Sequence, residues 1–146
     1  MTAPVATEPK PAASTWVPRI LVFSTHNISD PGVDLAGSAH MHYSPGVRVV
    51  SLPCTSGIRP NWILLAFERG FEGVFIASDG DECAYLPDCA ARSSRIVADA
   101  QSRMRERGLD PQRLRLAAIC SVCSEPFTRH VQQFSSALVD LGPVTT

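Results

Sequence analysis

Short apolar runs alternate with segments of helical character four times, and this alternation constrains the fold more than any other feature of the chain. The runs predicted as strands are Arg19–Ser24, Val47–Leu52, Gly73–Ser78 and Leu114–Ile119. The continuous apolar character of the first run is typical of a strand buried on both faces. Strand–helix–strand order implies crossovers between parallel strands, with helices on both faces of the sheet. We therefore predict a single-domain α/β fold, a three-layer open parallel sheet of the Rossmann or flavodoxin-like kind.

The segments between and after these runs carry signals for helix ends. The predicted helices are Pro31–Met41, Pro60–Arg69, Cys89–Arg107 and Glu125–Leu141. Pro60 suits a first helical position and Gly70 suits the left-handed residue that ends a helix. Asp30 and Ser124 are the expected N-caps of the first and last helices.

Length, composition and charge limit the class of protein. A chain of 146 residues with 45% hydrophobic side chains suggests one domain that needs no disulfides or metals for its core. Residues 1–16 are rich in Pro, Ala and Thr and are predicted to form a disordered arm, which leaves 17–146 as the folded domain. A net charge of −1 gives no indication of a nucleic-acid partner. No membrane span or secretory signal is recognisable, so a cytoplasmic location is expected, with the cysteines as reduced thiols or metal ligands.

The five cysteines lie in or beside three of the loops that follow the predicted strands. Parallel α/β sheets place function at these carboxyl ends. Cys54 follows the second strand, Cys83 and Cys89 the third, and Cys120 and Cys123 form a Cys-x-x-Cys after the fourth. Thiolates that converge on one rim suit a soft metal or an iron–sulfur cluster. Spacing alone leaves two other interpretations open: small side chains without a ligand, or a redox dithiol in the Cys-x-x-Cys.

The loop after the first strand offers a further alternative. Its small polar sequence, Ser24-Thr25-His26-Asn27-Ile28-Ser29, has hydroxyls of the kind that hold the phosphate of FMN in flavodoxins. Pro31-Gly32 interrupts the helix that should follow such a loop. A flavodoxin-like FMN carrier is therefore kept as an alternative function.

Several motifs, taken in order, resemble a known family. They include Ile20-Leu21-Val22-Phe23, Gly32-Val33-Asp34-Leu35-Ala36-Gly37, Val49-Val50-Ser51-Leu52-Pro53-Cys54, Ala66-Phe67-Glu68-Arg69-Gly70, Asp81-Glu82-Cys83-Ala84-Tyr85 and Gly108-Leu109-Asp110-Pro111. From about Arg19 to Gly142 the chain is similar to the delta subunit of methyl-viologen-reducing hydrogenase, which also occurs fused to, or beside, heterodisulfide reductase subunits. The resemblance implies a one-domain α/β unit with a [2Fe-2S] cluster. Such a unit passes electrons between a hydrogenase or other dehydrogenase and a flavin-containing partner.

The resemblance also implies where the cluster cysteines should lie, and most of them are absent. The family's Cys-x-x-Cys after the first strand falls on Thr25 and Ile28, and the first cysteine of its third-loop pair falls on Ser78, whereas Cys54 and Cys83 are present. Thr and Ser are poor ligands for iron, and Ile cannot ligate it.

Two outcomes are consistent with these substitutions. Either Cys120 and Cys123 join Cys54 and Cys83 as the metal ligands of a rearranged site, or the cluster is lost and the chain acts as a scaffold. Loss is the simpler outcome. The expected function is an accessory electron-transfer or scaffold subunit of a hydrogenase or heterodisulfide-reductase redox complex, without catalysis of its own; the alternative is a non-redox protein-interaction module that kept the fold. Cys89 is assigned no role from sequence.

Overall fold

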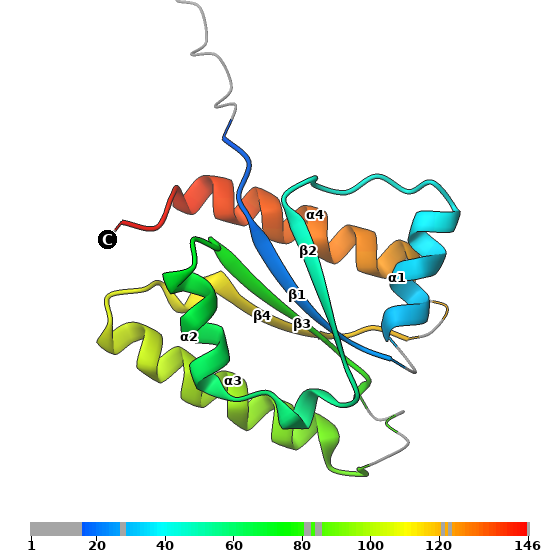
Figure 1. Ribbon diagram of the computed structural model, residues 1–146, viewed down its shortest axis with the longest axis horizontal. Coiled ribbons are helices and arrows are strands. Elements are labelled where there is room, and N and C mark those ends of the chain that lie inside the picture. The colour runs from blue at the N-terminus through cyan, green and yellow to red at the C-terminus, as the bar shows by residue number, and fades with distance from the viewer. Residues whose placement is uncertain are drawn as a thin grey trace, which may run out of the picture.

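Four strands form one parallel sheet in the computed structural model, in the order β2-β1-β3-β4 (Figure 1). The structure describes residues 16–26, 29–80, 83, 86–120, 122 and 124–145, so nearly all of the predicted N-terminal arm lies outside the described residues. The strands are β1 (Ile20–Thr25), β2 (Val47–Leu52), β3 (Gly73–Ser78) and β4 (Leu114–Ala118). Their parallel pairing confirms the predicted α/β class.

Helices cover both faces of this sheet and give it the three layers expected from the sequence. The helices are α1 (Ser29–Ser38), α2 (Pro60–Glu68), α3 (Cys89–Glu106) and α4 (Ser124–Leu141), with short 3-10 turns η1 (Thr55–Gly57) and η3 (Pro111–Arg113). Helices α1 and α4 contact each other on one face, and α2 and α3 contact each other on the other (Figure 1). None of the helices in the described part of the chain is long and apolar enough to cross a bilayer.

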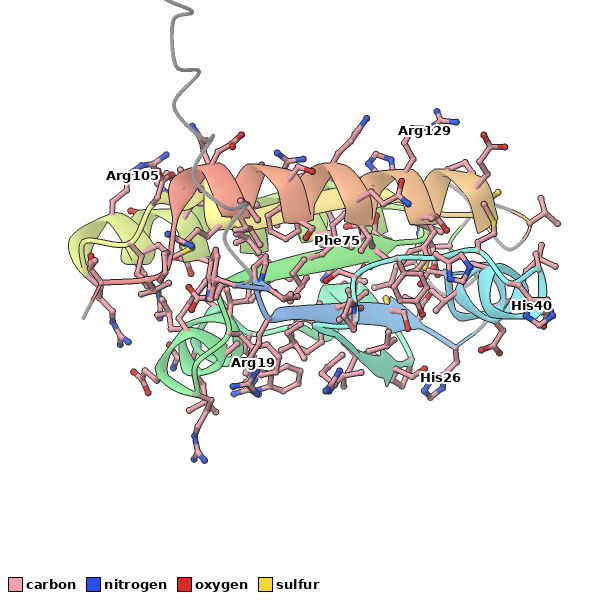
Figure 2. The ribbon with its side chains drawn as sticks, turned by 90° about the horizontal axis from the view of Figure 1, so that it is seen from above. Arg19, His26, His40, Phe75, Arg105 and Arg129 are labelled. Carbon is pink, nitrogen blue, oxygen red and sulfur yellow. The ribbon has the colours of Figure 1, made fainter. Side chains whose placement is uncertain are left out.

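Each face of the sheet has its own apolar core, because side chains alternate between the faces along a strand. Phe75 belongs to the core under α1 and α4, and its neighbours Val74 and Ile76 belong to the core under α2 and α3. Figure 2 shows Phe75 on β3 beneath α4, where its ring lies 6.2 Å from that of Phe134. All residues of β3 are buried, whereas the edge strand β2 leaves Val50 42% exposed.

Helix α1 differs from its predicted range, and the backbone shows why. It begins at Ser29, before the expected start at Asp30 or Pro31, and ends at Ser38 instead of Met41. His40 follows in the left-handed region with a φ of 55°. The N–H of Met41 then donates to the carbonyl of Ala36 at 3.0 Å, a bond that closes a helix end. Because His40 is not glycine, the sequence carried no signal for this ending.

Helix α4 approaches β3 closely at Gly73. A Cβ atom built on Gly73 would lie 2.6 Å from Leu138 Cδ1 and 2.8 Å from Phe134 Cζ. Glycine at the start of β3 therefore allows the helix to reach its position against the sheet.

Candidate metal centre

Three thiols meet where the chain leaves the carboxyl end of the sheet. Cys54 follows β2 and precedes η1, Cys83 lies in the connection from β3 to α3, and Cys89 is the first residue of α3. Their Sγ atoms all lie within 4.8 Å of one another, and Cys54 Sγ is 3.8 Å from Cys89 Sγ. All three are free cysteines. We call this set the thiol cluster.

Buried hydroxyl groups hold the two sides of the thiol cluster together. Turn η1 packs against α3, and the hydroxyl of Thr55 lies 2.9 Å from that of Ser93 on the first turns of the helix. Both of these residues are buried. The same Thr55 hydroxyl lies 3.6 Å from Cys89 Sγ. The loop after β2 is thus fixed to the start of α3, and this contact sets the spacing between Cys54 and Cys89.

The surroundings act differently on the two closest thiols. Burial is the largest influence on Cys54 and raises its pKa, but hydrogen bonds from Ser56, whose Oγ lies 3.0 Å from Cys54 Sγ, and from the other thiols leave the pKa below its ordinary value. Burial raises the pKa of Cys89 to about 11, and the neighbouring thiols add to that rise. A negative charge in the cluster is therefore accommodated first on Cys54.

The thiol cluster contains two of the four ligands predicted from sequence. Cys54 and Cys83 belong to it, and Cys123 lies outside the described residues. Cys120 is bonded in a disulfide, whereas the sequence led us to expect a reduced thiol or a metal ligand at this position. Strand order separates Cys120 from Cys54, because β4 and β2 are the two edges of the sheet. Three inter-strand spacings of about 4.8 Å place these strands roughly 14 Å apart.

Cys89 is the ligand candidate that the sequence interpretation missed. Helix α3 contacts turn η1, which follows β2, and Cys89 enters the cluster as the first residue of this helix. Its signal was present in the sequence, because Cys89 opens the predicted helix that follows the third strand, at the rim where the other cysteines gather. Its distance in sequence from Cys54 hid the contact.

A hydrogen-bonded network surrounds two of the positions, Thr25 and Ser78, where the family resemblance led us to expect cluster cysteines. Thr25 is buried, and its hydroxyl donates a hydrogen bond to Oδ1 of Asp79, which is also buried. The backbone N–H of Thr25 donates to Ser29 Oγ at 2.5 Å, and the N–H of Ser29 donates to Thr25 Oγ1 at 3.2 Å. The hydroxyl of Ser78 lies 3.5 Å from the carbonyl of Ala117, and Ile28 lies outside the described residues. Polar side chains therefore fill the crevice between β1 and β3.

This network also bears on the FMN alternative. A flavodoxin phosphate site uses the hydroxyls and N–H groups of the loop after the first strand. Here Thr25 and Ser29 bond each other, and the carboxylate of Asp79 lies beside them. A buried carboxylate repels a phosphate group. The described part of this loop therefore disfavours phosphate.

The described thiols do not fit a [2Fe-2S] cluster. Such a cluster takes two thiolates on each iron, and the two pairs bind at opposite ends of the cluster. The three described thiols instead lie within 4.8 Å of one another, an arrangement that converges on one point. Thr25 and Ser78, where the resemblance led us to expect further cluster cysteines, have hydroxyls engaged with protein atoms.

The fold and the site together define a doubly wound α/β protein with a cysteine cluster at the carboxyl edge of its sheet. The family model described as methyl-viologen-reducing hydrogenase, delta subunit, matches residues 20–142. The chain belongs to this family, which confirms the resemblance found in the sequence.

Individual relatives fall into two groups, large heterodisulfide reductase chains and small hydrogenase chains. In the first group, a subunit of the ferredoxin:CoB-CoM heterodisulfide reductase of Methanosarcina mazei is 30% identical over 91% of this chain but only 17% of the relative. In the second group, the vhu iron-sulfur subunit of the F420-non-reducing hydrogenase of Methanopyrus kandleri is 29% identical over 86% of this chain and 95% of the relative. The corresponding iron-sulfur subunit of Archaeoglobus profundus is 27% identical over 88% of this chain and 93% of the relative. The chain thus spans about a sixth of the first relative and nearly the whole of the two hydrogenase subunits.

Proposed function

We propose that this chain is an accessory subunit of a cytoplasmic redox complex of the hydrogenase or heterodisulfide-reductase type, and that it serves the complex as a scaffold without the family's [2Fe-2S] cluster. The observation that supports this most directly is the hydrogen bond from Thr25 to Asp79. Thr25 occupies a position where the family resemblance places a cluster thiolate. Its hydroxyl is buried and engaged, so it has no capacity left to bind iron.

Retention of the whole domain supports a role in assembly. The chain aligns with 93% and 95% of two hydrogenase iron-sulfur subunits, which supports a role that needs the whole domain. A scaffold needs the outer surfaces of the domain, which depend on the sheet and its helices. An electron carrier needs the cluster ligands as well, and Thr25 and Ser78 stand where the resemblance leads us to expect two of them.

The test is co-expression of the full chain, with a removable tag, together with the hydrogenase and heterodisulfide reductase homologues from the same genome. We expect the chain to elute with at least one of them in a complex of fixed stoichiometry, measured by size-exclusion chromatography with light scattering. We also expect no acid-labile sulfide on the chain when it is purified without oxygen.

Two results would count against the proposal in different ways. If the chain binds none of these proteins, it is not a member of such a complex. About two irons and two labile sulfides per chain would show that a cluster is held after all, and the role would be electron transfer.

A further inference from the structure

We propose that Cys54, Cys83 and Cys89 bind a single thiophilic metal ion of the Zn²⁺ type, in a mononuclear three-thiolate site. The inference concerns the isolated chain and does not depend on the scaffold role. It starts from the disagreement between the described thiols and the family's two-iron cluster.

The spacing of the sulfur atoms fits one ion. Zinc–thiolate bonds are about 2.3 Å long and point to the corners of a tetrahedron, which puts two thiolates on one ion about 3.8 Å apart. Cys54 Sγ and Cys89 Sγ are 3.8 Å apart. Cys83 Sγ lies within 4.8 Å of both, close enough to complete a face of the tetrahedron by a small side-chain rotation.

The backbone around these thiols is already arranged for a negatively charged site. Cys89 is 1% exposed and opens α3, an 18-residue helix whose N-terminus carries a partial positive charge. The Thr55–Ser93 contact holds the Cys54 loop against this helix at 2.9 Å. The segments that carry Cys54 and Cys89 are therefore already fixed relative to each other before an ion binds.

Hydroxyl groups lie within hydrogen-bond distance of two of the sulfur atoms. Ser56 Oγ lies 3.0 Å from Cys54 Sγ, and Thr55 Oγ1 lies 3.6 Å from Cys89 Sγ. Hydrogen bonds of this kind orient metal-bound ligands and stabilise their charge. Two of the three ligands thus have a neighbouring hydroxyl group in the described structure that can donate to a thiolate.

The composition of the site selects the class of ion. Thiolate sulfur prefers zinc and copper(I) over magnesium or calcium, which require oxygen ligands. No His, Asp or Glu joins the three thiols within the described residues, so the described ligands are thiols alone. Each thiol gives up its proton when it binds, so the complete step exchanges three S–H protons for one cation, and no atom is oxidised or reduced.

The experiment uses the full chain, purified with a reductant, stripped with a chelator and titrated with Zn²⁺ and, as a coloured probe, with Co²⁺. We expect about one ion per chain by elemental analysis. With Co²⁺ we expect a sulfur-to-cobalt charge-transfer band in the near ultraviolet. Cys54→Ser, Cys83→Ser and Cys89→Ser should each reduce the bound ion to near zero. The double variant Cys120→Ser with Cys123→Ser is the matched control and should keep it.

Cys83→Ser is the decisive variant if the Cys89 variant fails to fold, because Cys83 is only partly buried. Three results would overturn the proposal. One is a reduced chain that retains neither ion. Another is a bound ion that is retained in each of the three single variants and lost in the Cys120/Cys123 double variant. The third is iron bound together with labile sulfide in place of a single ion.

Discussion

Thr25, the last residue of β1, donates a hydrogen bond from its hydroxyl to the carboxylate of Asp79, the residue that follows β3. The two strands are neighbours in the sheet but lie far apart along the chain. Their contact occurs at the point where the strand order reverses direction, since the chain runs from β1 out to β2 and then returns past β1 to β3. In α/β folds this is the crevice where ligands commonly bind. Here a buried polar contact occupies it.

This contact predicts the effect of Thr25→Val, which keeps the shape of the side chain but removes its hydroxyl. We expect the free energy of unfolding to fall by about 1.5–3 kcal/mol, because Asp79 loses a donor to a buried charged group. Thr25→Ser is the control and should lose less, since it retains the hydroxyl. Urea denaturation measures both, and equal stability of the Val and Ser variants would show that the bond contributes nothing.

The close approach of helix α4 to Gly73 predicts that a larger side chain at this position lowers stability. Gly73→Ala should cost about 1–3 kcal/mol, because the added methyl group would overlap Leu138 and Phe134 in a packed core. Gly37→Ala is the matched control: Gly37 lies in α1 with no atom within 4 Å of the added Cβ. That change should stabilise the protein by up to about 1 kcal/mol through helix propensity. Thermal unfolding of the two variants should therefore shift in opposite directions, and a Gly73→Ala variant as stable as the parent would contradict the close packing.

The ion pairs of Arg113 and Arg107 differ in burial, and we expect their loss to have different effects on the free energy of unfolding. Arg113 lies 3.7 Å from the carboxylate of Glu72, with side chains only 6% and 16% exposed, and it also donates to the carbonyl of Gly142 at 2.6 Å. Arg113→Met should cost about 3 kcal/mol, because it removes the cation beside a largely buried carboxylate and the donor to the carbonyls of Glu72 and Gly142. Arg107→Met, which breaks the exposed pair with Glu68, should cost less than about 1 kcal/mol. Similar losses in urea denaturation would mean that burial does not distinguish the two pairs.

His130 predicts a dependence of stability on pH. Burial lowers the pKa of His130, and the charges of Arg115 and Arg129 lower it further. The unfolded chain therefore takes up this proton more readily than the folded protein. Stability should fall as pH decreases below about 6.5, the ordinary value of histidine. His130→Gln should lose less stability than the parent between pH 7 and pH 5, measured by urea denaturation at each pH. If the parent and the His130→Gln variant lose the same stability over this pH range, His130 has the same pKa in the folded and unfolded states.

Thr55 predicts how the thiol cluster responds to a change outside its ligands. Thr55→Val removes the hydroxyl beside Cys89 and Ser93. We expect the affinity for Zn²⁺ to fall by about 10–100-fold while the stoichiometry stays the same, as is typical for the loss of a supporting hydrogen bond. Thr55→Ser should restore most of the affinity. Competition against a chelator of known affinity measures it, and an unchanged affinity in the Val variant would show that this hydroxyl does not support the site.

The sequence predicted the elements that depend on local signals. Helix α2 begins at Pro60, as expected from proline at a first helical position, and Arg69 and Gly70 follow its end. The strand ranges of β2 and β3 were also predicted as observed, because their apolar runs are bounded by turn residues. The end of α1 was missed, since it depends on His40 in a left-handed conformation that histidine rarely adopts.

Local signals were sufficient to predict the α/β class and the rim that carries the cysteines, because strand and helix patterns are short-range and parallel strands end on the same side. The family came from a resemblance of ordered motifs along the chain. Which cysteines meet depends on contacts made across the sheet. The strand order separates Cys120 from Cys54, while the connection into α3 brings Cys89 within 3.8 Å of it. Such a contact arises from the packing of whole elements against one another, and the sequence separation of 35 positions between Cys54 and Cys89 carries no local signal of that distance.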